Sequence, residues 1–449
     1  MKYISPKFSL VATLLLSVQI TSAQWSPVGD GVAADGGFIQ SLAVYNNQLF
    51  AGGSFDSASA VGANNLAFFT GNAWQAPPVG VVPPPLDGPA IVNALAVYNN
   101  ILYVTGFFDS AGSLPTGSIA SWNGTSWDSI TTNIYQGTAM AVYNNELYVA
   151  GDLTAPSGVA ATGLVHWNGI TWATCPGWLR GGSGPTSLTV YNNKLIVGGN
   201  FDTAGTGNLL VNNIAAWDGT NWSALGAGLG DSSFGVQALA VVNGNLYAGG
   251  FISQVEGIPT HNVAEWNGSN WSALGEGLGA DTNSEFVSCL IDYNGTLVAG
   301  GVFTKMNGNQ PANGIAAWNG SNWSSLSTGV VDTNSPGFAA VESMCIWNGD
   351  LYVGGGFTNA GPVSANNIAR WTGPAGIVEP DINKITLYPN PADNMLIIEN
   401  ITPGTPLAFQ NLLGQTILQR QATSNREVID ISPLSSGMYF VNGVKFIKE

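Results

Sequence analysis

Charged side chains are scarce in this 449-residue chain, and basic ones are the scarcest. Only 8% of residues are charged, and 11 Lys and Arg stand against 27 Asp and Glu. The segment 24–373 holds 20 carboxylates but only four basic side chains, which gives it a formal net charge of −16. Such a surface repels nucleic-acid phosphates and anionic lipids, so it argues against both partners. It tolerates cations and neutral partners such as glycans.

Histidine and cysteine are also rare, which limits the chemistry available. The two histidines, His166 and His261, fall in different parts of the repeat described below, so they form neither a metal site nor a catalytic triad. Cys175, Cys289 and Cys345 are odd in number and contain no C-x-x-C pair. We therefore expect no disulfide framework and no zinc site, and we interpret the cysteines as small apolar fillers.

Helix-forming runs of Ala, Glu, Lys and Leu are missing, whereas 59 Gly, 15 Trp and 10% aromatic residues are present. This composition is too apolar for disorder and favours an all-β fold. The N-terminal residues 1–23 have the features of a secretory signal peptide: Lys2 and Lys7, an apolar run over 10–20, and small residues before a cleavage site between Ala23 and Gln24. We expect no transmembrane segment elsewhere.

A repeat is the strongest feature of the sequence. Seven copies of an apolar segment that runs into a glycine motif recur at intervals of 45 to 54 residues. The second position of each motif is Gly53, Gly106, Gly151, Gly199, Gly250, Gly301 or Gly355. Each copy is predicted to form four short antiparallel strands joined by Asn-Asn, Asn-Gly or Asp-Gly turns, as over 95–98, 102–104, 213–217 and 222–225. Radial packing of seven such sheets buries both faces of each, which predicts a seven-bladed β-propeller.

The ends of the repeat region predict how the ring closes. A Trp heads the fourth strand in six copies, but no such Trp follows Trp371. The missing strand is found at the N-terminus, where residues 25–31 resemble residues 222–228. We therefore predict that the strand beginning at Trp25 completes the last blade and removes two open sheet edges.

The repeat resembles kelch-type repeats and the propeller of galactose oxidase. The longer pattern GGxFTxAG…NNIAxWNGxxWxxLGxG also resembles repeats of fungal cortical polarity markers and of bacterial surface proteins. The resemblance covers residues 25–373 and implies a fold more than a function, because propellers host many unrelated activities. The copper ligands of galactose oxidase have no counterparts in this sequence, so that activity is not expected.

Beyond a linker at 374–382 the pattern changes, and residues 383–449 are predicted to form a small β-sandwich. This segment resembles the type A C-terminal sorting domain of the Bacteroidota type IX secretion system. The resemblance is carried by the opening Tyr388, Pro389, Asn390 and Pro391, by the central Gly414, by Gly437 and Tyr439, and by the terminal Lys448. It implies contact with the secretion machinery and delivery to the outer-membrane cell surface or the medium. A small adhesive sandwich is the alternative.

The longer loops between strands two and three, and between blades, are expected on one face of the ring, where ligand sites are usually placed. Asp231, Asp281 with Glu285, and Asp332 lie in successive blade-to-blade loops, whose oxygen atoms would suit Ca²⁺ only weakly. Asp292 stands where the other copies carry Val or Ile on the innermost strand. A carboxylate there has a raised pKa unless it faces a watery channel.

These features leave three functional hypotheses open. The first is a non-catalytic secreted or surface propeller that binds a glycan or a protein. The second is an extracellular enzyme acting on polysaccharide, with channel-mouth carboxylates such as Asp292 as acid and base; it requires two carboxylates converging on one site. The third is a structural surface protein. No catalytic residue, resident metal or cofactor is assigned.

Overall fold

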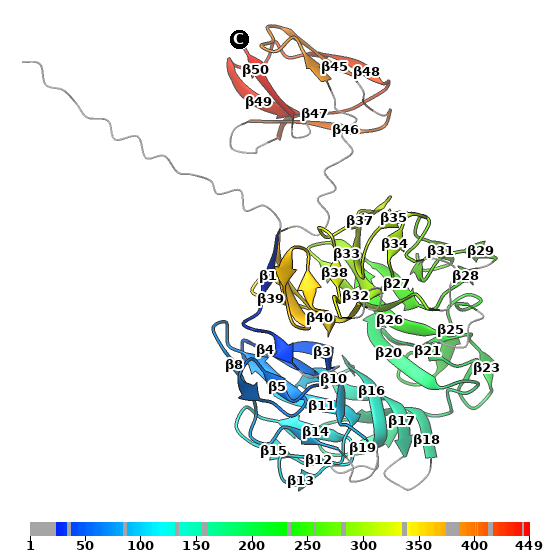
Figure 1. Cartoon of the computed structure of the whole chain (residues 1–449). Coiled ribbons are helices and arrows are strands. Elements are labelled where there is room, and N and C mark those ends of the chain that lie inside the picture. Colours follow the sequence, from blue (N-terminus) through cyan, green and yellow to red (C-terminus); the bar gives the residue numbers. More distant parts are fainter. Residues whose placement is uncertain are drawn as a thin grey trace, which may run out of the picture. The chain divides into compact units, whose positions relative to one another are not determined.

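Figure 1 shows the computed structural model of the chain, which describes residues 24–33, 37–83, 88–130, 134–154, 160–230, 235–255, 257–279, 284–334, 339–373, 386–399, 401, 403–411, 416–441 and 444–449. The predicted signal peptide and linker lie outside these residues. The described residues form strands and turns but no helix, which confirms the prediction of an all-β chain. In particular, no described helix could cross a bilayer. The chain divides into two compact units, and the boundary between them in sequence falls between Gly376 and Ile377.

Seven four-stranded antiparallel sheets make up the described part of the first unit. We number them by the chain order of their innermost strands. They are the first sheet, β3 (Phe38–Tyr45), β4 (Gln48–Ser54), β7 (Leu66–Phe69) and β8 (Trp74–Gln75); the second, β10 (Ile91–Tyr98), β11 (Ile101–Phe107), β14 (Ile119–Trp122) and β15 (Trp127–Asp128); the third, β16 (Ile134–Tyr143), β17 (Glu146–Thr154), β18 (Ala160–Trp167) and β19 (Trp172–Thr174); the fourth, β20 (Gly184–Tyr191), β21 (Lys194–Asn200), β24 (Ile214–Trp217) and β25 (Trp222–Ala224); the fifth, β26 (Val236–Val242), β27 (Asn245–Gly250), β30 (Val263–Trp266) and β31 (Trp271–Ala273); the sixth, β32 (Phe286–Tyr293), β33 (Thr296–Val302), β36 (Ile315–Trp318) and β37 (Trp323–Ser325); and the seventh, β39 (Ala340–Trp347), β40 (Asp350–Gly356), β43 (Ile368–Thr372) and β1 (Gln24–Pro27).

Two-residue strands form small additional ladders in the connections between these strands and sheets. They are β2 (Val32–Ala33), β5 (Ser57–Ala58), β6 (Val61–Gly62), β9 (Val81–Val82), β12 (Ser110–Ala111), β13 (Leu114–Pro115), β22 (Thr203–Ala204), β23 (Leu209–Leu210), β28 (Gln254–Val255), β29 (Ile258–Pro259), β34 (Lys305–Met306), β35 (Gln310–Pro311), β38 (Val330–Val331), β41 (Asn359–Ala360) and β42 (Val363–Ser364).

The tight turn between the first two strands of each sheet follows from its sequence. In the first sheet Asn46 and Asn47 have φ values of 49° and 57°, and in the seventh Asn348 and Gly349 have values of 53° and 85°. Asn and Gly adopt positive φ at the lowest cost, and two such residues in succession match the twist of the flanking strands. These turns place the first two strands of each sheet in direct antiparallel register.

The hydrophobic core lies between successive sheets. Seven clusters of buried side chains are found among the described residues of this unit, and each joins two neighbouring sheets. One of them joins Trp347 and Tyr352 of the seventh sheet to Leu49 and Phe69 of the first. The strands β3, β10, β16, β20, β26 and β32 lie around a common centre, and β39 contacts both β32 and β3 (Figure 1).

The two glycines of the repeat motif are required for two different steric reasons. A Cβ on Gly354, the first of its pair, would lie 2.7 Å from Ile39 Cγ2 of the first sheet, so this glycine allows the two sheets to approach. A Cβ on Gly355 would lie 2.0 Å from the carbonyl oxygen of Ala340, so this glycine accommodates the neighbouring strand. Contacts under 3 Å with backbone cannot be relieved by a rotamer change, which explains why the motif recurs in sheet after sheet.

The N-terminal strand β1 occupies the outer edge of the seventh sheet. It pairs with β43 from Gln24↔Thr372 to Pro27↔Ala369, and the rings of Trp25 and Trp371 lie 5.0 Å apart. The Trp25 indole N–H donates a 3.1 Å hydrogen bond to the Leu326 carbonyl of the sixth sheet. The same inter-sheet bond is made by the indoles of Trp74 to Val28, Trp172 to Ile130, Trp222 to Pro176, Trp271 to Leu225 and Trp323 to Leu274.

The second unit consists of two sheets that share one core. The three-stranded sheet contains β44 (Thr386–Tyr388), β45 (Met395–Glu399) and β48 (Arg426–Asp430), and the four-stranded sheet contains β46 (Pro406–Gln410), β47 (Thr416–Gln421), β49 (Gly437–Val441) and β50 (Val444–Lys448). Leu396 and Ile398 from one sheet pack with Phe409 and Phe446 from the other in a single buried cluster. This arrangement is the layered packing of a small β-sandwich.

The three cysteines are free, and their thiols are buried or half-buried. Burial raises the pKa of Cys175 to about 12 and that of Cys345 to about 11, and it holds the pKa of Cys289 well above its ordinary value. With these pKa values, the thiols of Cys175 and Cys345 are protonated at neutral pH.

We predict that replacing Trp25 by Ala lowers the free energy of unfolding by about 3–5 kcal/mol, the usual cost of truncating a large buried aromatic side chain. Trp25 is 4% exposed and donates to Leu326. Denaturant unfolding followed by circular dichroism measures the change. Trp127→Ala is the matched control, because Trp127 is half-buried and its indole nitrogen makes no hydrogen bond. Equal losses for both variants would contradict the role given to Trp25.

We also predict that a thiol reagent at pH 8 labels the native chain at least ~100-fold more slowly than the unfolded chain. The thiolate is the form of cysteine that reacts. A pKa of about 11 for Cys345 leaves roughly one thiol in a thousand ionised at this pH. Absorbance of the released chromophore measures the rate. Rapid labelling of even one thiol in the native chain would contradict the burial of that thiol.

Candidate functional site

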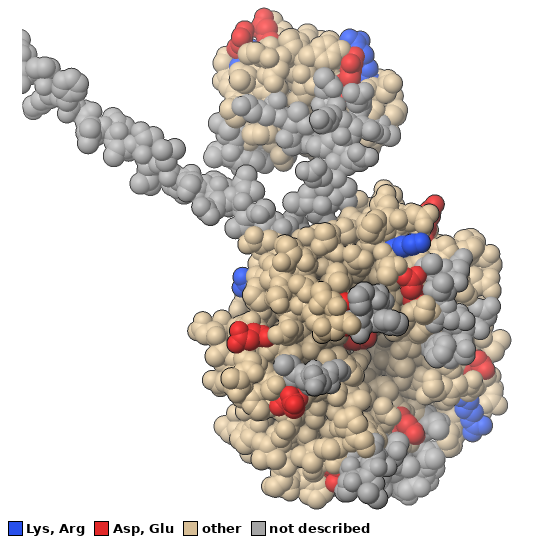
Figure 2. Space-filling model, viewed as in Figure 1, with Lys and Arg blue, Asp and Glu red and all other residues tan. Residues whose placement is uncertain are grey.

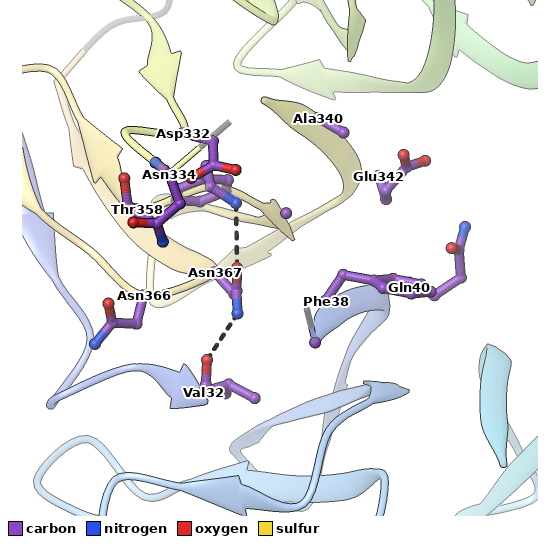
Figure 3. Close-up of a pocket in the computed structure, with 13 residues that line it drawn as sticks. Val32, Phe38, Gln40, Asp332, Asn334, Ala340, Glu342, Thr358, Asn366 and Asn367 are labelled. Carbon is purple, nitrogen blue, oxygen red and sulfur yellow. Dashed lines mark hydrogen bonds between the residues drawn. The ribbon is translucent and has the colours of Figure 1, made fainter. Parts of the chain in front are cut away.

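A cavity lies between the seventh and first sheets, at the edge where their innermost strands begin. Its volume is about 520 Å³. Figure 3 shows this cavity, which we call the rim cavity. Its lining residues come from the starts of β3 and β39, the end of β40 and the adjoining loops: Val32, Gly37, Phe38, Gln40, Asp332, Asn334, Ala340, Glu342, Gly356, Phe357, Thr358, Asn366 and Asn367.

A pair of small residues in the seventh sheet lies beside the cavity. At the start of each innermost hairpin, the paired positions carry at least one bulky residue in the first, second and sixth sheets, as in Phe38↔Ser54, Ile91↔Phe107 and Phe286↔Val302. The seventh sheet has Ala340↔Gly356 instead. A Cβ on Gly356 would meet only Phe38 Cβ, at 3.8 Å, so the space beside it is open.

A β-bulge next to this pair brings a polar side chain to the same edge in every sheet. The register of each innermost hairpin shifts by one residue, and the extra residue is always polar. The extra residues are Gln40, Asn93, Thr138, Thr186, Gln237, Ser288 and Glu342. Three of them bond the next sheet: Asn93 Nδ2 donates to Gly137 O at 2.9 Å, Thr138 Oγ1 to Pro185 O at 2.8 Å and Thr186 Oγ1 to Val236 O at 2.6 Å.

Glu342 is the charged residue among these seven bulge residues, and it is not one of the site residues predicted from the sequence. Its half-buried side chain lines the rim cavity. Desolvation by the surrounding protein raises the pKa of its carboxyl above the usual value, and the nearby Ser288 hydroxyl opposes this in part. The signal that could have found it is the same one that drew attention to Asp292: a carboxylate on an innermost strand where the other copies are uncharged.

Asp332, a predicted site residue, lies across the rim cavity from Glu342 (Figure 3). Its Oδ1 accepts a 3.0 Å hydrogen bond from the Asn334 backbone N–H, which fixes the carboxylate at the start of its loop. Asp332 also lines a smaller hollow of about 60 Å³ between the sixth and seventh sheets. The structure therefore brings one predicted carboxylate and one that was missed to the same cavity.

Asparagine and threonine side chains complete the polar wall of the cavity, and several are held in place by the N-terminal segment. Asn367 Nδ2 donates to Val32 O at 2.9 Å, and its Oδ1 accepts from Phe357 N at 3.1 Å. Asn366 Nδ2 donates to Asp30 O at 2.9 Å. Of the thirteen described lining residues, none is basic. The cavity is thus polar and acidic, and it depends on residues from both ends of the repeat region.

Glu285, another predicted loop carboxylate, does not line the rim cavity. Glu285 Oε1 accepts hydrogen bonds from the backbone N–H of Thr304 at 2.9 Å and from its hydroxyl at 2.7 Å, so it orders its own loop. Asp231 and Asp281 lie outside the described residues. Among the residues that the structure describes, no group of three or more His, Cys, Asp or Glu side chains is placed to hold a metal ion.

Asp292 lies near the opposite end of its strand, six residues beyond the start of β32, which is roughly 20 Å at the rise of a β-strand. It is half-buried, and its Oδ1 accepts a 2.7 Å hydrogen bond from Gly295 N in the tight turn. The aliphatic residues at this position in other sheets are partly exposed, up to 40% for Val142 and Val190, so a carboxylate there reaches water. The structure does not bring Asp292 together with Asp332.

The two histidines make separate local contacts. His166 Nδ1 lies 2.6 Å from Glu146 Oε2, and its ring stacks on Tyr148. His261 Nδ1 lies 2.6 Å from the Glu276 carbonyl oxygen in an exposed turn. Neither lines the rim cavity, so imidazole chemistry is not available to a ligand bound there.

In the second unit, the residues of the sorting motif hold the fold together. Tyr388 Oη donates to Glu399 Oε1 at 2.5 Å, and Ile447 N donates to Asn390 Oδ1 at 2.9 Å. Tyr439 stacks on Phe446, and Gly437 pairs with Lys448, whose side chain is only 7% exposed. Pro389 and Pro391 flank Asn390 and follow cis peptide bonds. Gly414 lies outside the described residues.

The charges of the first unit are sparse on the face shown in Figure 2, where Asp and Glu lie singly and Lys and Arg are fewer. The face is hollowed toward its middle. A ligand on this face therefore meets a mostly neutral surface, and the rim cavity concentrates the polar and acidic groups described above.

Several solved structures resemble this chain at low sequence identity. They include the WD40 β-propeller domain of Doa1 (TM-score 0.46, 14% identity, 78% of this chain and 97% of that chain) and YjhT (TM-score 0.39, 15% identity, 66% and 99%). A third is PorZ, a surface component of the type-IX secretion system of Porphyromonas gingivalis (TM-score 0.26, 13% identity, 95% and 75%). No curated protein matches the chain in sequence.

Residues 386–445 match the family model described as a secretion system C-terminal sorting domain. The matched segment contains Tyr388, Asn390 and Tyr439 and covers most of the second unit. The prediction of a type IX sorting domain is confirmed by this match, and with it the implied contact with the secretion machinery. The chain is therefore exported to the cell surface or secreted.

Proposed function

We propose that residues 24–373 form a seven-bladed propeller in which β1 closes the ring, and that this propeller binds an extracellular glycan without catalysis. The proposal includes a signal peptide over 1–23, a linker over 374–382 and a sorting domain over 383–449. The β1–β43 pairing, the core cluster between the seventh and first sheets, and the hydrogen bond from Trp25 to Leu326 support closure. We also propose that the repeats are of the kelch-like type.

The rim cavity is the observation that carries the binding function. Its volume of about 520 Å³ falls within the range of sites that hold small ligands or sugar units, whereas protein partners usually use flatter surfaces. Gln40 and Asn334 contribute side-chain amides to the lining, and Phe38 and Ala340 contribute apolar surface. Amides and carboxylates together both donate to and accept from neighbouring hydroxyl groups, which is the chemistry a saccharide needs.

Hydrolysis of a polysaccharide is the second candidate, and one observation favours it. Asp332 and Glu342 line the same cavity, and the pKa of Glu342 is raised, as it is in carboxylic acids that protonate a leaving group. Binding is preferred because Asp332 is tied to its own loop by the Asn334 N–H and eleven of the thirteen lining residues are uncharged.

We predict that Gly356→Val lowers glycan affinity at least ~10-fold, because the added side chain projects into the rim cavity. The substitution introduces the residue found at the same position of the sixth sheet, Val302, and its Cβ meets only Phe38 Cβ at 3.8 Å. The measurement is a glycan array probed with the chain from Gln24 onward, followed by calorimetry on the hits.

Ser54→Val is the matched control for this variant, because Ser54 occupies the same register position in the first sheet but does not line the cavity. It should bind like the unmodified chain. Glycan binding that is unaffected by Gly356→Val would remove the cavity from the proposal. The absence of binding to any glycan would favour a purely structural surface role.

We predict that no array hit is hydrolysed during prolonged incubation with the chain, because binding alone is assigned to the cavity. Reducing-end analysis by mass spectrometry measures turnover. Turnover that disappears in both Glu342→Gln and Asp332→Asn would replace the binding function with the enzymatic one. Turnover unaffected by either variant would point to a contaminating enzyme, and a repurified sample tests this directly.

A further inference from the structure

Glu342, the bulge residue of the seventh sheet, cannot donate the hydrogen bond that three of its counterparts donate to the next sheet. Asn93, Thr138 and Thr186 each donate a side-chain hydrogen bond to a carbonyl of the next sheet. An ionised carboxylate has no hydrogen to donate, so Glu342 cannot make the equivalent bond to the first sheet. Its side chain instead lies at the rim cavity, beside Gln40 (Figure 3). The donor role of Asn93, Thr138 and Thr186 therefore does not account for a carboxylate at this position.

The surroundings of Glu342 lack positive charge. Within the described residues, neither Glu342 nor Asp332 forms an ion pair, and no lining residue is basic. The rest of residues 24–373 contains only four Lys and Arg. Removing a carboxylate from bulk water without a cationic partner is costly, and the raised pKa of Glu342 reflects that cost. A cation supplied by a ligand would offset it.

We propose that the glycan bound in the rim cavity carries a free amino group, and that its ammonium contacts the carboxylate of Glu342. This inference rests on the proposed binding function and specifies the ligand as an amino sugar. Gln40 lies on the same side of the cavity as Glu342, and Asp332, Asn334 and Thr358 lie on the other side (Figure 3). A hexosamine between the two walls places its ammonium at one wall and its hydroxyl groups against the amides of the other.

The open cavity favours a sugar over a lysine side chain. A lysine presents an unbranched apolar stem that would leave the side-chain amides of Asn334 and Gln40 without ligand partners. A sugar ring carries hydroxyl groups in several directions and satisfies polar groups on both walls. Ammonium–carboxylate hydrogen bonds are also stronger than neutral ones, so the amino group should dominate selectivity.

The test compares three oligosaccharides of equal length that differ only at C2: tetramers of glucosamine, N-acetylglucosamine and glucose. Calorimetry with the chain from Gln24 onward should show at least ~10-fold tighter binding of the glucosamine tetramer than of the other two. Glu342→Gln should abolish this preference and leave the weak binding of all three. Gln occurs at the same bulge position in the first and fifth sheets, so the variant keeps a residue that the fold accepts.

Asp292→Asn is the matched control, since it removes one negative charge at the other end of an innermost strand and keeps the oxygen that accepts from Gly295 N. It should retain the full preference. Equal binding of the three tetramers, or a preference that persists in Glu342→Gln, would overturn the inference while leaving the proposed function intact. Tighter binding of a lysine-bearing peptide than of any tetramer, lost in Glu342→Gln, would also overturn it. Binding that Gly356→Val does not change would instead defeat the proposed function.

Discussion

The pairing of β1 with β43 joins residues that lie up to 348 positions apart in sequence, and the rim cavity depends on it. Loop-closure entropy rises only slowly with length, so pairing over this distance costs roughly 2 kcal/mol more than pairing over the ~50 residues of one repeat. Burial of the Trp25 side chain contributes about 2–3 kcal/mol by itself, before its hydrogen bond to Leu326 and its contact with Trp371. The short strand is therefore favourable despite its remote partner.

The same N-terminal segment also shapes the candidate site. After β1 the chain turns through Gly31, where Val32 accepts from Asn367 and Asp30 accepts from Asn366. These two asparagines immediately precede β43 of the seventh sheet, whereas the chain that follows Val32 enters the first sheet at β3. The wall of the rim cavity is thus built by the residues that join the last sheet to the first. A ligand in the cavity would contact both ends of the repeat region and strengthen their association.

The sequence alone was sufficient for the architecture of the sheets and for the sorting unit. Repeated turns such as Asn46-Asn47 and the shared Trp positions specify strand order, because each turn needs positive φ and each Trp needs a neighbouring sheet. The site was harder to predict. Its cavity lies beside the Ala340↔Gly356 pair, whose partners are known only once the hairpin register is fixed. The bulge residue stands 13 positions before the second glycine of every copy, as Gln40 does before Gly53 and Glu342 before Gly355, so the relation of Glu342 to Gln40 is visible in an ungapped alignment, but the cavity beside it is not.

Asp292 and Glu342 show why an unusual residue in a repeat is informative only when its local role is known. Both replace uncharged residues on an innermost strand. Asp292 accepts a hydrogen bond from Gly295 N, and it occupies a position where the side chain reaches water in the other sheets, so a local structural role explains it. Glu342 replaces side chains that donate between sheets, and as a carboxylate it loses that bond without gaining a cation. A departure from the repeat that weakens the fold locally, next to an open cavity, is better explained by a ligand than by packing.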